Sequence, residues 1–136
     1  MRHPKLGDAK VQNIVYQLIT KWTFLSDEVR SIGSSCAITY LMGGDYQRIC
    51  HSVKNMIANL TGMICDGAKP SCSLKICSGV STALLSALLS MEGKYVSEVE
   101  GIIDSDVDKC IHNLTSIGKE AMCATDDMVL KIMTSK

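Results

Sequence analysis

The sequence has no excess of charge of one sign, because its 14 basic residues are balanced by 14 acidic ones. No basic cluster alternates with aromatic residues, so the electrostatic footprint of a nucleic-acid-binding protein is missing. Aromatic residues are also few, six in 136, whereas there are eight Met and many Ala, Ser, Gly and Leu residues. This composition suits closely packed helices better than a β-sandwich, and we predict an all-α protein.

The sequence also lacks an export signal and a long uninterrupted apolar run. Asp8, Lys10 and Gln12 interrupt the region in which a signal peptide needs continuous apolar residues. The longest apolar stretch, residues 80–89, is short for a membrane span of about 20 residues and contains Ser and Thr. We therefore expect a cytoplasmic protein without a membrane partner. Seven cysteines without an export signal indicate a reducing compartment, where clustered thiols are more often metal ligands or reactive groups than disulfides.

Apolar residues at helical spacing predict about 5–6 helices in a compact domain. A stripe from Val11 to Trp22 predicts an N-terminal helix, which Asp8 is placed to cap. Residues 31–42 predict a short helix that is stopped by two glycines, Gly43 and Gly44. Asp45 then caps a helix that continues to Ile64.

The second half of the chain contains the most apolar predicted helix. Residues 71–91 are apolar on nearly every face, which predicts a central helix buried among the others. Ser105 is placed to cap a helix that Gly118 ends, and Thr125 begins the last helix. Residues 95–103 fit either an extended segment or one helical turn.

The segment from Gly62 to Lys75 differs in chemistry from its surroundings. It places two thiols, a carboxylate, two ammonium groups and a Gly/Pro turn between two apolar segments. Burying such groups is costly unless a partner or ligand compensates, so the mixture indicates a turn with a chemical role. Cys65 ends one predicted helix and Cys72 lies in the first turn of the next, so a helical hairpin can bring both thiols together at a metal.

The cysteine spacing alone is a weak metal signal, because neither C-x6-C nor the following C-x4-C to Cys77 is typical of zinc knuckles or ferredoxins. The alternative is that free cysteines act as small buried hydrophobes. We favour this alternative for the remaining thiols, which are Cys36, Cys50, Cys77, Cys110 and Cys123.

Asp66, Gly67 and Lys69 allow two interpretations. Asp-Gly is common turn chemistry, and Pro70 fits the first position of a helix, so the backbone alone explains these residues. Alternatively, Lys69 and the N-terminus of the following helix make an anion site for a small carboxylate. The histidines have no partner at ligand spacing, and we expect His51 and His112 on helix surfaces.

The whole segment from Gly62 to Lys75 resembles the signature of the L-cysteine desulfidase family. These serine dehydratase-like proteins are related to the α-domain of bacterial iron–sulfur L-serine dehydratases. The resemblance continues before the segment, in residues 40–44 and 54–61, and after it, in residues 99–104 and 106–109. We therefore divide the chain into residues 1–31, an N-terminal helix unlike the family, and residues 32–136, a cluster-binding domain.

The resemblance implies a helical domain with a 4Fe–4S cluster, whose open iron polarises a small amino acid for β-elimination. The products are pyruvate, ammonia and, from L-cysteine, sulfide; L-serine is the related substrate. Carried over by position, Cys65 and Cys72 become metal ligands, and Lys69 and Asp66 become catalytic. Gly67 and Lys69 then bind the substrate.

Two departures from the family shape the prediction. Family members are longer, with an N-terminal region that contributes an active-site cysteine, and Ser26 stands about where an upstream cluster cysteine is expected. We expect this chain to be the C-terminal part of such an enzyme, encoded by a truncated, split or frameshifted gene. In that case a missing N-terminal half completes the cluster, or the cluster is absent. The alternative is a helical remnant or interaction module without a cluster. A zinc-binding module ranks below both, because no four-ligand set has zinc spacing.

Because loss of the upstream part uncovers an apolar face, we also predict homo-oligomers.

Overall fold

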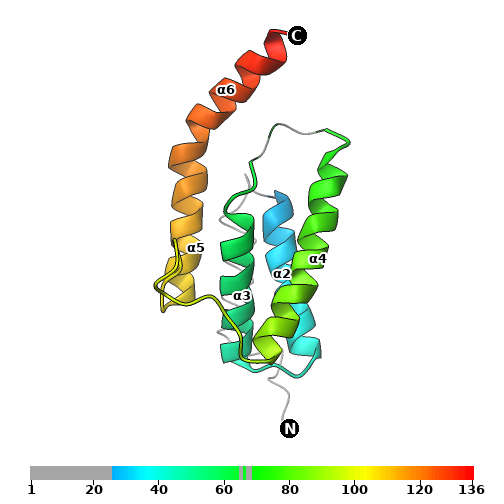
Figure 1. Ribbon diagram of the computed structural model, residues 1–136, viewed down its shortest axis with the longest axis vertical. Helices are drawn as coiled ribbons and strands as arrows, with labels where there is room; N and C mark the ends of the chain where they lie inside the picture. The colour runs from blue at the N-terminus through cyan, green and yellow to red at the C-terminus, as the bar shows by residue number, and fades with distance from the viewer. Residues whose placement is uncertain (1–25, 65, 67–68) are drawn as a thin grey trace.

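The computed structural model describes residues 26–64, 66 and 69–136, and these residues form helices and connecting turns without a strand (Figure 1). The prediction of an all-α protein is confirmed. The elements are α2 (Ser26–Leu41), α3 (Tyr46–Leu60), α4 (Cys72–Met91), α5 (Val107–Ser116), the π-helical turn η1 (Ile117–Ala121) and α6 (Met122–Thr134). The N-terminal helix predicted from Val11 to Trp22 lies outside the described residues.

Helices α2 and α3 form as the glycine and aspartate signals predict. Gly43, with a φ of 87°, follows the end of α2, in the left-handed conformation that glycine adopts without steric cost. The Asp45 side chain caps α3 by accepting a hydrogen bond from the Arg48 N–H at 3.0 Å. Helix α3 is strongly amphipathic, and its buried face supplies the centre of the core: Ile49, Val53, Met56, Ile57 and Leu60.

Helix α4 packs against both α2 and α3, but it is not the central buried helix that its composition predicts. Its buried residues are all small: Gly79, Ala83, Ser86, Ala87 and Ser90. The backbones approach so closely that a Cβ atom on Gly79 would lie 2.1 Å from the Ser31 Oγ. Large side chains cannot enter such a contact, and most of those on α4 point to solvent instead. The sequence interpretation was wrong because apolar content does not reveal how close two helices approach.

The end of α4 is fixed by a glycine and by an arginine from α3. Gly93 has a φ of 75°, and the Lys94 N–H returns to the Leu89 carbonyl at 2.8 Å, as in a Schellman motif. Arg48 Nη1 donates to the Ser90 carbonyl at 2.6 Å and also to the Met91 carbonyl. A guanidinium at these last carbonyls satisfies orphan acceptors and complements the negative end of the helix dipole.

Residues 95–106 form turns rather than a strand or a helix and lead into α5. The α5 cap is Asp106, which accepts a hydrogen bond from the Asp108 N–H at 2.9 Å, so the predicted cap at Ser105 is one residue too early. Helix α5 lies beside α3, and Lys54 Nζ of α3 donates to the Ser105 carbonyl at 2.9 Å.

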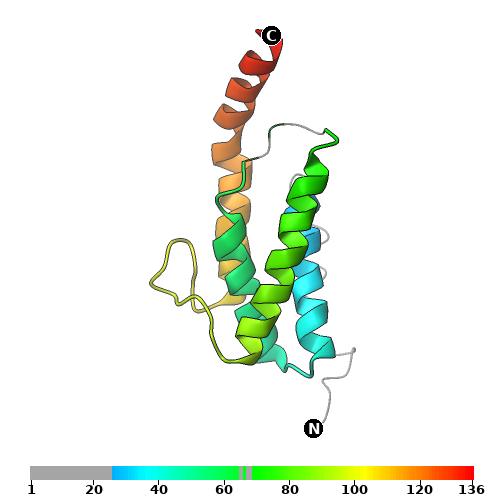
Figure 2. The same ribbon diagram turned by 45° about the vertical axis from the view of Figure 1, so that its right-hand side comes forward.

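Helices α5, η1 and α6 follow one another without a break, and α6 extends past the bundle (Figures 1 and 2). The predicted stop at Gly118 is wrong, since that glycine lies inside η1 and does not adopt a positive φ. The last helix therefore begins at Met122 rather than at Thr125. No residue of α6 is buried.

One helix of the described residues, α4, is long and apolar enough by length and composition to cross a membrane. The apolar stretch counted from the sequence, residues 80–89, is half of this 20-residue helix, because residues 72–79 and 90–91 continue the same helix.

Candidate functional site

The turn between α3 and α4 carries the predicted chemistry and connects the two helices at one end of the bundle (Figure 1). Thr61 closes α3, with its N–H donating to the Ile57 carbonyl at 3.1 Å. At the other side, the Cys72 N–H donates to the Lys69 carbonyl at 2.9 Å, so residues 69–72 form a turn that leads into α4. Of the predicted site residues, Asp66, Lys69 and Cys72 are described, whereas Cys65 and Gly67 lie outside the described residues.

Asp66 lies between two ammonium groups. Lys69 Nζ pairs with one carboxylate oxygen, and Lys75 Nζ lies 3.0 Å from the other. The side chains of Asp66, Lys69 and Lys75 are 44%, 41% and 28% exposed. With one negative and two positive charges (2 − 1), this group carries a net charge of +1 and remains open to solvent.

Lys75 is the residue for which sequence reasoning gave no role. Its Nζ donates to the Ile64 carbonyl at 2.9 Å as well as contacting Asp66, so it binds the turn on both sides of position 65. Lys75 lies on the first turn of α4, and its long side chain reaches back across the turn. The sequence signal that could have identified Lys75 is the aspartate at position 66, followed by lysines three and nine residues later, on either side of the start of a helix.

The cysteines separate into buried and exposed thiols. Two thiols are buried, Cys36 and Cys110, and two are partly buried, Cys50 and Cys72. Two others are exposed, Cys77 and Cys123, so the prediction of a buried hydrophobe is wrong for these two. Both lie on helix faces that no described element covers. Burial raises the pKa of the Cys36 thiol to about 12, which keeps it protonated at neutral pH.

The described residues do not make up an iron–sulfur ligand set on their own. They contain no group of three His, Cys, Asp or Glu side chains close enough to hold a metal, and Cys72 is the one described thiol at the turn. A cluster normally needs cysteine thiolates at several irons, so the described part of the turn fits at most one corner of such a group.

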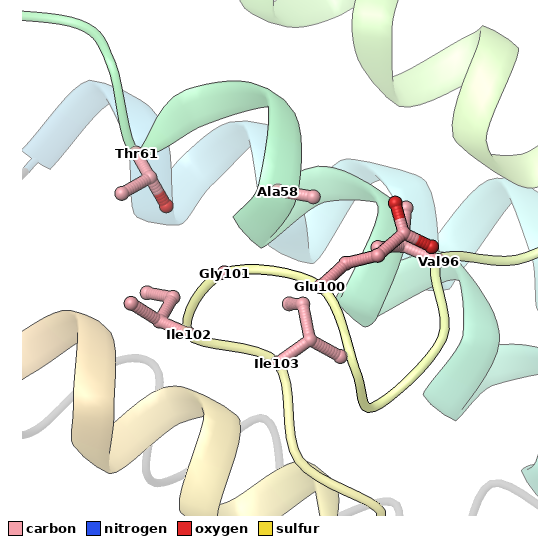
Figure 3. A pocket seen from close by; sticks show the side chains of 7 residues that line it. All are labelled: Ala58, Thr61, Val96, Glu100, Gly101, Ile102 and Ile103. Carbon is pink, nitrogen blue, oxygen red and sulfur yellow. The ribbon is translucent and has the colours of Figure 1, made fainter.

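A cavity of about 310 Å³ lies between α3 and the segment from Val96 to Ile103 (Figure 3). Its lining is mainly apolar, with Thr61 at one end and Glu100 at the other. Both polar side chains are already engaged: the Thr61 hydroxyl donates to the Ile57 carbonyl, and Glu100 accepts from the N–H and hydroxyl of Ser97. Asp66, Lys69 and Cys72 do not line this cavity, so it is separate from the charged turn.

The described histidines do not contribute to the turn. His51 stacks on Tyr95 with ring centroids 3.6 Å apart, and partial burial, assisted by Lys54 and Arg48, lowers its pKa. His112 is exposed on α5, where the sequence placed it. His51 is only partly exposed because the residues after α4 cover one side of its ring.

Comparison with known proteins places these observations in a family. Residues 28–131 match the model of the serine dehydratase alpha chain. UPF0597 proteins of Parabacteroides distasonis and Phocaeicola vulgatus are 67% and 68% identical over 108 residues, and one of Oleidesulfovibrio alaskensis is 42% identical. These matches cover 79% of this chain but 25% of each relative, so the chain spans about a quarter of their length. No solved structure gives a significant match. The chain therefore belongs to the serine dehydratase alpha chain family.

Proposed function

We propose that this chain supplies the substrate-binding turn of an amino-acid lyase that catalyses β-elimination from L-cysteine or L-serine. The elimination from L-cysteine releases sulfide and leaves pyruvate and ammonia after hydrolysis, and the elimination from L-serine releases water instead. The observation that carries the proposal is the exposed turn with a net charge of +1, in a chain of the serine dehydratase alpha chain family.

The three charged residues have different roles in this proposal. Lys69 is exposed enough to bind the carboxylate of a small amino acid, because an ammonium group forms charge-assisted hydrogen bonds to carboxylates. Asp66 orients Lys69 through their ion pair. Lys75 is a positioning residue, since it contacts Asp66 and the Ile64 carbonyl and is the least exposed of the three.

We propose that Cys72, together with Cys65, also contributes thiolate ligands to a 4Fe–4S cluster. The described residues lack a complete ligand set, so the remaining ligands come from polypeptide that the relatives have and this chain does not cover. A helical module that binds no cluster is the competing function, and the same absence of a ligand set favours it.

Anaerobic reconstitution with iron and sulfide tests the cluster. We expect visible absorption and about four irons per chain if the thiols bind a 4Fe–4S group. Cys65→Ala and Cys72→Ala should each lose iron, whereas Cys77→Ala and Cys123→Ala, which remove exposed thiols outside the turn, should retain it. Equal iron contents in all four variants would support the module without a cluster, whereas no iron in the parent chain would mean that the ligands outside this chain are indispensable.

Equilibrium dialysis with labelled L-serine tests the turn separately. Lys69→Met should weaken binding by about tenfold, which corresponds to losing one hydrogen bond to a charged group. Lys119→Met is the matched control, because it removes an exposed lysine from η1, outside the turn. Saturable binding that both variants weaken equally, or no saturable binding, would exclude the turn as a carboxylate site.

A further inference from the structure

Helix α4 exposes six large apolar side chains, which we call the α4 apolar face: Leu74, Ile76, Val80, Leu84, Leu85 and Leu88. Their exposed fractions are between 43% and 70%. Val80, Leu84 and Leu88 are four residues apart and form a continuous row, because such positions lie on the same side of a helix. No charged residue occurs between Lys75 and Glu92. A solvent-facing helix surface normally carries charged residues, so this face is unusual for a surface that remains in water.

Helix α4 cannot bury this face by turning about its own axis. Its opposite side holds the small residues that allow α2 and α3 to approach, including Gly79 against Ser31. Rotation would bring leucines into a contact that has no room for the Cβ atom of residue 79. The face is therefore a fixed feature of the described bundle, and only polypeptide outside this bundle or a lipid phase can cover it.

A second copy of the chain covers too little surface through this face. A 20-residue helix is about 30 Å long, and a face about 10 Å wide on it offers about 300 Å². A stable protein interface usually needs about 800 Å² from each partner. The larger apolar surface includes α6, which exposes Met128, Leu130, Ile132 and Met133 and extends past the end of the bundle that carries the turn (Figures 1 and 2).

We infer that the α4 apolar face binds the polypeptide that makes up the remaining three quarters of the relatives. Relatives that are 67% and 68% identical over 108 residues carry this helical unit together with about three times as much additional chain. A partner of that size can contact α4 and α6 at once, on both sides of the charged turn. The inference rests on the exposed surfaces and the lengths of the relatives, and it does not depend on the proposed chemistry.

Cys77 is a natural reporter for this contact. It is exposed, and it lies on α4 three residues before Val80 and seven before Leu84, hence on the apolar face. We would insert the matched segment of this chain into the Parabacteroides distasonis relative in place of its own, and measure alkylation of Cys77 by a bulky maleimide, without iron, using peptide mass spectrometry. Cys77 should react at least about tenfold more slowly in this full-length chimera than in the chain alone, because a covered thiol reacts through local opening.

Val99→Cys provides the control, since Val99 is 88% exposed in the segment between α4 and α5. Its alkylation rate should change by less than about twofold between the chain and the chimera. Circular dichroism shows whether the chimera folds. If it does not, this chain is co-produced with the part of the relative that it does not match, and the alkylation rate of Cys77 is measured in the same way.

Three results would overturn the inference. Equal Cys77 rates in the chain and in the folded chimera or co-produced complex would mean that the rest of the relative does not cover the face. Protection that develops in the chain alone as its concentration rises would assign the face to a second copy. Protection of the chain alone by phosphatidylcholine vesicles would assign it to lipid. Because the measurement needs neither iron nor substrate, its outcome is independent of the cluster and dialysis experiments.

Discussion

Helices α3 and α4 lie side by side in the bundle, but they bury opposite kinds of residue. Helix α3 places large apolar side chains such as Ile49, Met56 and Ile57 in the core. Helix α4 buries glycine, alanine and serine and leaves most of its leucines exposed. The difference shows that two kinds of contact hold the bundle together. Side-chain burial dominates around α3, and close backbone approach dominates between α4 and α2.

Truncation of a large side chain should separate the two helices most clearly. Ile57→Ala removes a side chain with no exposed surface and should lower the free energy of unfolding by about 2–5 kcal/mol, through lost burial and a cavity. Leu84→Ala removes a half-exposed side chain and should change it by no more than about 0.5 kcal/mol. Urea unfolding of both variants measures the contrast. Similar losses in the two would mean that the α4 apolar face is already covered in solution.

Adding a methyl group tests the close approach with a smaller effect. Gly79→Ala should destabilise the chain by about 1–3 kcal/mol, because its Cβ would lie 2.1 Å from the Ser31 Oγ and 3.0 Å from the Ser31 Cβ. Gly33→Ala, in α2, has no heavy atom within 4 Å of the new Cβ and should stabilise the chain by about 0.4–1 kcal/mol. Thermal unfolding of the pair should therefore give shifts of opposite sign, and a stabilising Gly79→Ala would contradict the close packing of α4 on α2.

The pH dependence of stability should reveal the buried thiol of α2. Burial raises the Cys36 pKa from 9.0 to about 12, so the folded state keeps a proton that the unfolded state releases. Stability should thus be complete below pH 9 and decrease as the pH rises toward 12, by about 1 kcal/mol at pH 10. Tyr46, whose pKa burial also raises to about 12, acts in the same direction. Partial burial lowers the His51 pKa, so stability should also fall as the pH drops below 6.5.

Melting temperatures from pH 5 to pH 10 test these slopes, with the pH range chosen to bracket both ordinary pKa values. Cys36→Ala should flatten the alkaline limb, because it removes the buried thiol whose pKa is raised. An alkaline limb that survives Cys36→Ala at its original slope would assign the effect to Tyr46 and the remaining thiols.

Local signals predicted much of the bundle. Asp45 caps α3 and Gly43 follows α2 as expected, because capping depends on residues within one turn of the helix end. The local signals were wrong at one predicted helix end and at one predicted helix cap. Gly118 continues a helix through a π-turn instead of stopping it, and Asp106 rather than Ser105 accepts the capping hydrogen bond.

The sequence by itself determined the helical composition, the family and the position of the charged turn between two helices. These properties depend on residue type and on spacing within about 15 residues. Only the tertiary structure decided which face of α4 is buried, that Cys77 is exposed, and that Lys75 joins Asp66 and Lys69. The reason is that helix packing is set by the distance between backbones, which depends on small residues of two different helices at once. Such a pairing, like that of Gly79 and Ser31, is not present in any single segment of the chain.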